Sequence, residues 1–181
     1  MKSLQYFIIE PLNGKRYENT IDDIGLIFSA SIEDHKATQR FAVVKEIPKF
    51  YSGEIVPGDI VVVHHNIFRL YYDIKGRLKS SWNYIDEDTY ICEQNQIYMY
   101  KRNGEWKVPY PYCFVEPIDK LDSFLAVDEK FANLLGKVTF YPSDDLAVGD
   151  LVAFRPDTEY EFKIDGNLMY RMQIKDLCLK I

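Results

Sequence analysis

One sequence segment occurs twice in the chain, and this repeat restricts the possible folds more than any other feature of the sequence. Residues 56–63 are Val-Pro-Gly-Asp-Ile-Val-Val-Val, and residues 148–154 are Val-Gly-Asp-Leu-Val-Ala-Phe. Their upstream neighbours also recur, because Tyr-Phe-Ile-Ile-Glu-Pro-Leu at 6–12 corresponds to Tyr-Cys-Phe-Val-Glu-Pro-Ile at 112–118. Self-similarity of this kind indicates one structural unit used twice. We therefore expect a fold built from two copies of that unit.

Each copy continues with similar strands and turns. Residues 41–48 and 137–142 are rich in β-branched and aromatic residues, and each run ends in a proline, which lacks the N–H donor of a strand ladder. A turn Asp-Ile-Lys-Gly at 73–76 has the similar turn Lys-Ile-Asp-Gly at 163–166. Each half of the chain therefore predicts short strands joined by turns.

The length and composition fit two small domains. The chain has 181 residues, of which 47% are apolar and 15% aromatic, enough to fill two cores and too many for global disorder. A proline-rich cluster at 108–112 separates the two copies. We expect a first domain at 1–110 and a second at 111–181.

The charge pattern argues against two classes of partner. The formal net charge is -6 and no stripe of lysine or arginine is present, whereas a nucleic-acid surface normally carries a basic excess. No apolar run approaches the length that spans a bilayer, and the N-terminus shows no signal-peptide pattern. The sequence predicts a soluble, cytoplasmic protein without a nucleic-acid or membrane partner.

The three cysteines give no sign of a disulfide or a metal site. Cys92, Cys113 and Cys178 are odd in number, lie in apolar strand-like contexts and show no C-x-x-C spacing. We expect reduced residues of the core or of a sheet.

Catalytic motifs are weak throughout. His64 and His65 follow the first Gly-Asp strand, and adjacent strand residues face opposite sides, so the two do not point at one metal. The acidic groups at 86–88 and 144–145 are typical of solvated turns. No nucleophile triad or phosphate-binding glycine motif accompanies them. The sequence therefore predicts a non-enzyme without a cofactor or a metal.

A long polar segment in the first copy carries one apolar island. Residues 13–39 are mostly polar, but they include Gly25-Leu26-Ile27-Phe28. A loop of this length is unusual inside a compact domain and is usually functional or disordered, and an apolar tripeptide in such a loop suggests burial by a partner. Leu26, Ile27 and Phe28 are therefore candidate partner-binding residues. The alternative is a short strand in which Ile24, Leu26 and Phe28 alternate and pack on their own sheet.

The order of these features resembles the GroES-type co-chaperonins, the chaperonin-10 family. In that family a first strand precedes a mobile loop with a glycine and three apolar residues, and a Val-Gly-Asp-hydrophobic strand, a turn and a closing strand follow. The second copy matches this ending through residues 148–154, 160–166 and 175–181, and the first copy supplies the loop tag at 25–28. The resemblance covers nearly the whole chain and implies two tandem, partly open GroES-like β-barrels.

The sequence departs from the family pattern in several places. The roof hairpin between the strand-proline and Gly-Asp is shortened to 49–54 and 143–145, which resembles phage-type members. The first copy carries an insertion at about 78–96, followed by a hairpin at Asn103-Gly104. The loop of the second copy, at 119–135, has apolar residues at helical spacing and predicts a small helical segment.

The resemblance implies a function and a mode of assembly. A co-chaperonin caps a GroEL-type chaperonin ring through its loop tag and assists protein folding, and its subunits form a homo-oligomeric ring through their terminal strands. For a viral protein, the compartment is the host cytoplasm. The alternative is a virion or other assembly protein that uses the same barrel as an interaction module, since a fold alone does not determine function.

Overall fold

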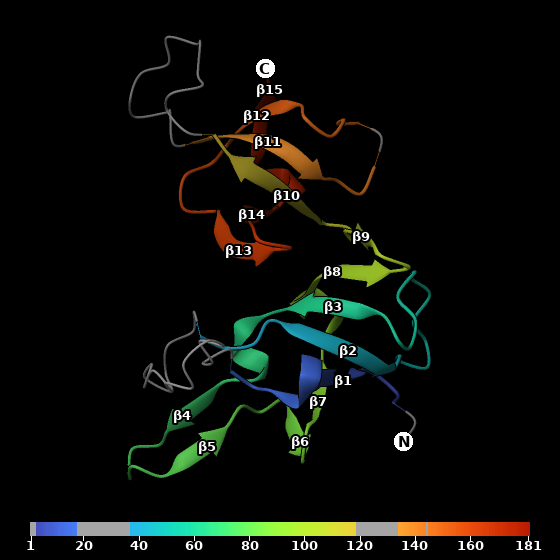
Figure 1. The fold of residues 1–181 in the computed structure, drawn as a ribbon, viewed down its shortest axis with the longest axis vertical. Helices are drawn as coiled ribbons and strands as arrows, with labels where there is room; N and C mark the ends of the chain where they lie inside the picture. The colour runs from blue at the N-terminus through green and yellow to red at the C-terminus, as the bar shows by residue number, and fades with distance from the viewer. Residues whose placement is uncertain (1–2, 18–36, 119–133, 144) are drawn as a thin grey trace. The chain divides into compact units, whose positions relative to one another are not determined.

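The protein consists of two compact units of antiparallel sheet (Figure 1). The computed structural model describes residues 3–17, 37–118, 134–143 and 145–181. The units are Met1–Trp106 and Lys107–Ile181, so the division falls slightly before the expected boundary at 110. The helices among the described residues are 3-10 turns of three residues, and none is long and apolar enough to cross a membrane. The expected all-β fold is confirmed.

The first unit contains a seven-stranded sheet in the order β6-β7-β1-β2-β3-β8-β9. Its strands are β1 (Phe7–Pro11), β2 (Phe41–Glu46), β3 (Ile60–Val63), β6 (Tyr84–Asp86), β7 (Thr89–Cys92), β8 (Ile97–Arg102) and β9 (Glu105–Lys107). A separate two-stranded hairpin and three 3-10 turns complete the unit: β4 (Leu70–Tyr72), β5 (Leu78–Ser80), η1 (Leu12–Gly14), η2 (His65–Ile67) and η3 (Gln94–Gln96).

The second unit contains a six-stranded sheet in the order β13-β14-β10-β11-β12-β15. Its elements are β10 (Tyr112–Pro117), β11 (Leu135–Phe140), β12 (Leu151–Phe154), β13 (Tyr160–Ile164), β14 (Asn167–Gln173), η5 (Ile174–Asp176) and β15 (Leu177–Lys180). In the described part of the chain, both sheets end in unjoined strands, so hydrogen bonding closes neither into a barrel.

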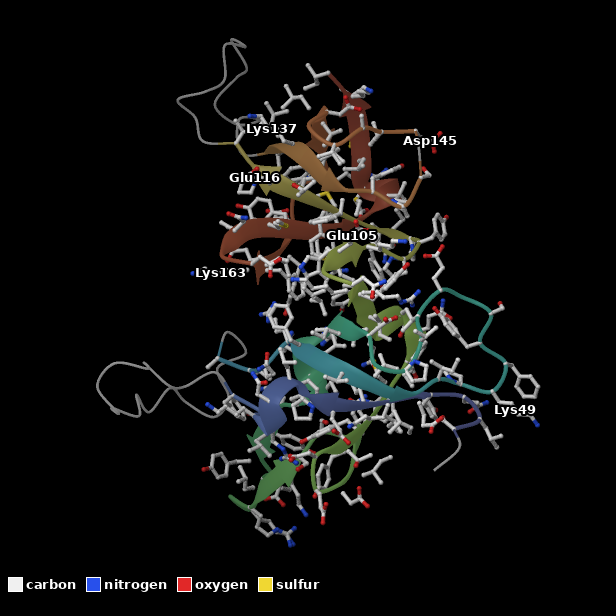
Figure 2. The ribbon with its side chains drawn as sticks, turned by 45° about the vertical axis from the view of Figure 1, so that its right-hand side comes forward. Lys49, Glu105, Glu116, Lys137, Asp145 and Lys163 are labelled. Carbon is white, nitrogen blue, oxygen red and sulfur yellow. The ribbon has the colours of Figure 1, made fainter. Side chains whose placement is uncertain are left out.

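The two sheets repeat one another strand by strand. The first six strands of the first order, β6-β7-β1-β2-β3-β8, correspond one to one to β13-β14-β10-β11-β12-β15, and β9 has no counterpart. The irregularities recur as well, because a bulge lies at Ile8/Ile9 in β1 and at Phe114/Val115 in β10. Figure 2 shows Glu116 and Lys137 side by side where β10 pairs with β11. The expected duplication is confirmed at the level of strand register.

The cores also repeat position by position. In each unit the described residues include a cluster of buried apolar side chains. The six buried members of the second cluster occupy the register positions of six members of the first: Cys113 for Phe7, Val115 for Ile9, Val138 for Val44, Val152 for Val61, Phe154 for Val63 and Met172 for Cys92. Different apolar side chains therefore occupy equivalent positions in the two units, as expected because cores tolerate hydrophobic substitutions that keep their total volume.

The repeated Gly-Asp segment forms the turn that connects the second and third strands of the first unit. Val44 donates its N–H to the carbonyl of Asp59 at 2.9 Å, and its own carbonyl accepts from Gly58 at 2.8 Å. Gly58 has φ +94°, a conformation that L side chains rarely adopt. The Asp59 carboxylate accepts from the Val56 N–H at 2.9 Å, and from both Nε and Nη2 of Arg102, at 2.8 and 2.6 Å.

The second copy of this turn has the same backbone pattern and a weaker ion pair. Val138 and Gly149 repeat the two backbone hydrogen bonds at 2.8 and 2.7 Å, and Gly149 has φ +93°. The Asp150 carboxylate accepts from the Ala147 N–H at 2.8 Å. Its ion-pair partner is Lys180 on β15, and the Asp150 side chain is 20% exposed, compared with 3% for Asp59. The aspartate thus caps the turn in both units.

One sequence correspondence differs from the structure. The turn at 73–76 joins the separate β4–β5 hairpin, whereas the turn at 163–166 joins β13 to β14 within the main sheet. By sheet order, the counterpart of β13–β14 is β6–β7, so a part of the expected insertion at 78–96 belongs to the repeat. The elements that the first unit adds are the hairpin at 70–80 and the edge strand β9.

Other local expectations have mixed outcomes. Asn103 and Gly104 have φ 53° and 88° between paired strands β8 and β9, so the expected hairpin is confirmed.

Cys92 and Cys113 are buried, as expected, and burial raises the pKa of the Cys113 thiol to about 12. Cys178 lies in β15 but is exposed, because no strand follows β15 in the sheet order. The expected helical segment falls almost entirely on 119–133, outside the described residues.

The duplicated turn yields a paired test of the buried ion pair. Asp59→Asn removes the carboxylate that holds Arg102, and we expect a loss of about 1.5–3 kcal/mol of unfolding free energy at pH 7. Trp82 and Trp106 are the two tryptophans of the chain and both lie in the first unit. Their fluorescence during urea unfolding therefore measures this loss. The control is Asp150→Asn, which we expect to leave the urea midpoint of the first unit unchanged. An equal shift of this midpoint in both variants would contradict the stabilising role of the Asp59–Arg102 ion pair in the first unit.

The pH dependence of the same residue follows from its pKa. Burial would raise the pKa of Asp59, but the hydrogen bonds from Arg102 and Val56 and the charge of Arg102 together hold it below the usual value. A carboxyl with a lowered folded-state pKa stabilises the fold above its unfolded pKa, about 3.9, and the contribution is lost as the pH falls through the folded value. The stability difference between wild type and Asp59→Asn should therefore shrink below about pH 4, in urea titrations at stepped pH.

Candidate partner-binding site at the base of the first loop

The residues predicted to bind a partner, Leu26, Ile27 and Phe28, lie outside the described residues. The structure describes the two ends of the segment that carries them. Tyr17 and Thr38 form an antiparallel β-bridge, and the Gln39 N–H donates to the Arg16 carbonyl at 2.9 Å. The chain therefore leaves the sheet and returns to it at one point.

Buried polar side chains fix the return of the chain into β2. Thr38 is 2% exposed and Gln39 is 5% exposed. The Gln39 Oε1 atom accepts from the backbone N–H groups of Arg40 and Phe41, both at 3.0 Å. Because an unpaired buried amide would be costly, these bonds stabilise one conformation at the start of the strand. The base of the loop is thus a defined structure.

Arg16 connects the outgoing end of the loop to two other parts of the unit. Its Nη1 donates to Ser80 Oγ on β5 at 3.2 Å. Its guanidinium carbon lies 4.8 Å from the ring centre of Tyr84 and 5.2 Å from that of Tyr90, within cation–π range. Burial raises the pKa of Tyr90 to about 12, and the Arg16 charge acts in the opposite direction. The phenol therefore stays neutral beside this cation.

Tyr17 joins the loop base to the β4–β5 hairpin. Its Oη accepts the backbone N–H of Leu70 at 2.8 Å. The hairpin turn is ordered by Asp73, whose Oδ1 accepts from the N–H groups of Lys75 and Arg77 at 2.8 and 2.9 Å, while Oδ2 accepts from Arg77 Nε. An isolated two-stranded hairpin is marginal in water. The loop base and this turn together hold it.

The outer surface of the hairpin and of the segment after it is unusually apolar. Large hydrophobic side chains that are exposed here include Tyr71, Tyr72, Ile74, Leu78 and Trp82. Ile74 at the tip is fully exposed. Contiguous exposed apolar surface on a water-soluble unit commonly marks a site of interaction. The loop base therefore stands beside a second candidate contact surface.

A shallow polar pocket of about 380 Å³ opens next to the hairpin. Its lining residues are His64, Asn66, Arg69, Tyr71, Ser81, Trp82 and Gln96. His64 Nδ1 accepts the Asn66 N–H at 3.1 Å, and the rings of His64 and His65 stack with centres 4.3 Å apart. The two histidines lie at the start of η2 instead of on a strand, so the expected alternation across a sheet does not apply to them.

The pocket does not assemble a recognisable catalytic group. It holds one imidazole and one guanidinium, with neither a carboxylate nor a cysteine among its lining residues. Within the described ranges, no group of three or more His, Cys, Asp or Glu side chains is placed to hold a metal ion. Hydrogen bonding and stacking are the chemistry that this lining supports.

Comparisons with known proteins add no assignment. No protein-family model matches this sequence, and no curated protein matches it.

Sequence patterns pointed to the loop but not to its connection with the hairpin. The contacts of Arg16 and Tyr17 join residues that are more than fifty positions apart, and no local pattern encodes such a pairing. One signal was present in the tyrosines and tryptophan of 71–84, whose density exceeds what the sheet needs for its core.

The bond between Tyr17 and Leu70 can be tested with a single oxygen. In Tyr17→Phe the Leu70 amide loses its acceptor, and we expect about ten-fold faster amide hydrogen exchange at Leu70, equivalent to about 1.4 kcal/mol. The amides of β2 and β3 serve as internal controls and should keep their protection. Unchanged exchange at Leu70 would contradict the proposed tie between loop base and hairpin.

Proposed function

We propose that the protein is a co-chaperonin, which caps a GroEL-type chaperonin ring through Leu26, Ile27 and Phe28 and assists protein folding. The observation that carries this proposal is where the segment containing these three residues is attached to the sheet. It leaves and re-enters the sheet between the first and second strands, at a base closed by the Tyr17–Thr38 bridge. The resemblance of the sequence to GroES-type proteins places the chaperonin-binding tag in the same connection.

The duplicated sheet supports the proposal in a second way. Two copies of one strand order, each with a Gly-Asp turn before the third strand, agree with a tandem co-chaperonin. The connection between β10 and β11 repeats the topological position of the loop, but the apolar run at 124–127 has no glycine before it, and the apolar residues of 119–135 follow helical spacing. We therefore assign one binding tag to each chain.

The energetics favour weak binding by a single loop and strong binding by several. Burying Leu26, Ile27 and Phe28 in an apolar groove contributes about 1.5–3 kcal/mol for each side chain. Ordering the segment opposes this by about 1–2 kcal/mol per residue. A ring that presents several loops raises the effective concentration of each, so the assembly binds tightly while single contacts remain reversible.

We further propose that the chains form a homo-oligomeric ring through an edge of the second sheet. β15 ends the strand order, whereas its counterpart β8 is followed by β9. Leu179 and Ile181 are 66% and 53% exposed along this edge. An uncovered apolar edge strand is an aggregation hazard, so pairing with a neighbouring chain would protect it.

A charge in the loop tag tests the proposed function. Ile27→Asp should abolish co-migration with a purified GroEL-type chaperonin and ADP in gel filtration, because burial of an unpaired carboxylate is costly. Its thermal midpoint, followed by tryptophan fluorescence, should stay within about 2 °C of wild type. The matched control is Ile32→Asp, in the same segment but outside the tag, which should still bind.

Two outcomes would overturn this assignment. A wild-type protein that remains separate from the chaperonin would favour the assembly-protein alternative. A large fall in the thermal midpoint of Ile27→Asp would instead indicate that the tag packs on its own sheet.

Ring formation has its own test. Native mass spectrometry of the wild type should give one discrete oligomer, and Leu179→Lys should convert it to smaller species, since a charge on an edge strand opposes pairing. Leu168→Lys is the matched control, because Leu168 is also exposed but lies on β14, which has a neighbour on both sides. A wild-type monomer at micromolar concentration would count against the ring.

A further inference from the structure

The β4–β5 hairpin is an addition to the repeated sheet. In the second unit, β12 is joined to β13 by residues 155–159, whereas the equivalent connection in the first unit, between β3 and β6, contains the whole hairpin. Because the second sheet forms without such an element, the hairpin is not required by the fold. The hairpin lies in the same unit as the proposed tag at 25–28, and this suggests a role in binding and not in folding.

The apolar residues of the hairpin face solvent at its end. Tyr72 and Leu78 are directly opposite each other on β4 and β5, and they are 50% and 48% exposed. Ile74 in the turn is fully exposed. The turn itself is held by Asp73 and Arg77, so these side chains are presented on an ordered scaffold. Such an arrangement suits insertion of an apolar tip into a partner.

The hairpin also differs from the rest of the chain in charge. Residues 70–80 contain three basic residues and one acidic residue, a net charge of +2, whereas the whole chain has -6. The basic residues are Lys75, Arg77 and Lys79, with Asp73 as the acid. A basic element on an acidic protein is complementary to a partner surface that is itself acidic.

The end of the hairpin opposite its tip is bonded to the loop base, because Leu70 and Ser80 are the pair furthest from the turn. Leu78 and Ser80 are two positions apart on β5, so their side chains share one face of the hairpin. Ser80 on that face receives the hydrogen bond from Arg16, and the Leu70 N–H is bonded to Tyr17. The apolar pair of Tyr72 and Leu78 is therefore continuous with the point where the tagged segment leaves the sheet.

We propose that the hairpin makes a second contact with the chaperonin, on a surface that is apolar at its centre and acidic at its rim. This inference rests on the proposed function and adds a binding surface to it. The loop extends the distance over which the protein can contact its partner. The hairpin is already ordered before binding, so its contact costs little conformational entropy. The two contacts act on one partner, so the hairpin raises the affinity of each subunit.

A protein partner fits these residues better than a nucleic acid. The exposed aromatic residues Tyr71 and Tyr72 suit either partner, but Ile74 at the tip and Leu78 are aliphatic and gain by burial in an apolar groove. The overall charge of -6 would also repel a polyanion at longer range. Nucleic acid is nevertheless included as an explicit arm of the test.

The experiment compares matched surface variants in binding to a purified GroEL-type chaperonin with ADP. Ile74→Ser removes a side chain that solvent already surrounds, so folding should be unaffected, and we expect affinity to fall about ten-fold or more. Val148→Ser is the control, since Val148 is 76% exposed in the second unit; it should change affinity by less than about two-fold. Lys75→Glu with Lys79→Glu should weaken binding and flatten its dependence on salt.

The outcomes separate this inference from the proposed function. Loss of binding in Ile27→Asp together with wild-type affinity in Ile74→Ser would reject the hairpin contact and leave the co-chaperonin assignment intact. Weakening in Ile74→Ser with no effect of Ile27→Asp would keep the contact and reject the tag. A wild-type protein that does not bind would reject both, and salt-sensitive binding to single-stranded DNA that is lost in the lysine variant would replace the protein partner by nucleic acid.

Discussion

The Gly-Asp turn is the constraint on which the rest of each sheet depends. Its backbone bonds to Val44 or Val138 set the register between the second and third strands, and every other pairing on that side of the sheet follows. A one-residue slip would turn every side chain of the third strand to the opposite face, and so remove Val61 and Val63, or Val152 and Phe154, from their core clusters. The turn needs a residue that accepts φ near +90° and an acid that caps the adjacent N–H, which explains why these two residue types recur while their neighbours vary.

The duplication of the sheet could be predicted from the sequence, because two similar stretches are expected to fold alike; the strand order itself was not predicted. Local turn chemistry was less informative. The segments at 73–76 and 163–166 look alike because any tight hairpin favours aspartate and glycine, yet they join different pairs of strands. Strand pairing in the sheet is decided by contacts between distant residues, so a similar turn does not establish an equivalent position. The exposure of Cys178 was not predicted for a related reason. A strand pattern in the sequence does not reveal whether the strand lies at the edge of the sheet.

The two units have diverged in unequal ways. Among the described residues, the core cluster of the second unit has six buried members and that of the first is larger. The first unit also has the hairpin, which Arg16 and Tyr17 tie to the base of the loop. For the candidate site, the sequence indicated the tag through an apolar island in polar surroundings. The supporting base was not predictable, because a hydrogen bond from Leu70 to a tyrosine oxygen leaves no trace in hydrophobic periodicity. The residues proposed for recognition could thus be selected from the sequence, and the residues at the base of the segment could not.

The strand order has a consequence for how each unit assembles during folding. The first strand lies inside the sheet, between the second strand and one near the other end of the unit: Phe7 pairs with Cys92 in the first unit, and Cys113 pairs with Met172 in the second. Neither sheet can therefore grow as a series of adjacent hairpins, and such nonlocal closure is slow. The first unit must close a longer stretch of chain, which includes the hairpin and the tagged segment. We therefore expect the second unit, whose first strand pairs across a shorter stretch of chain, to lose slightly less entropy on closing its sheet.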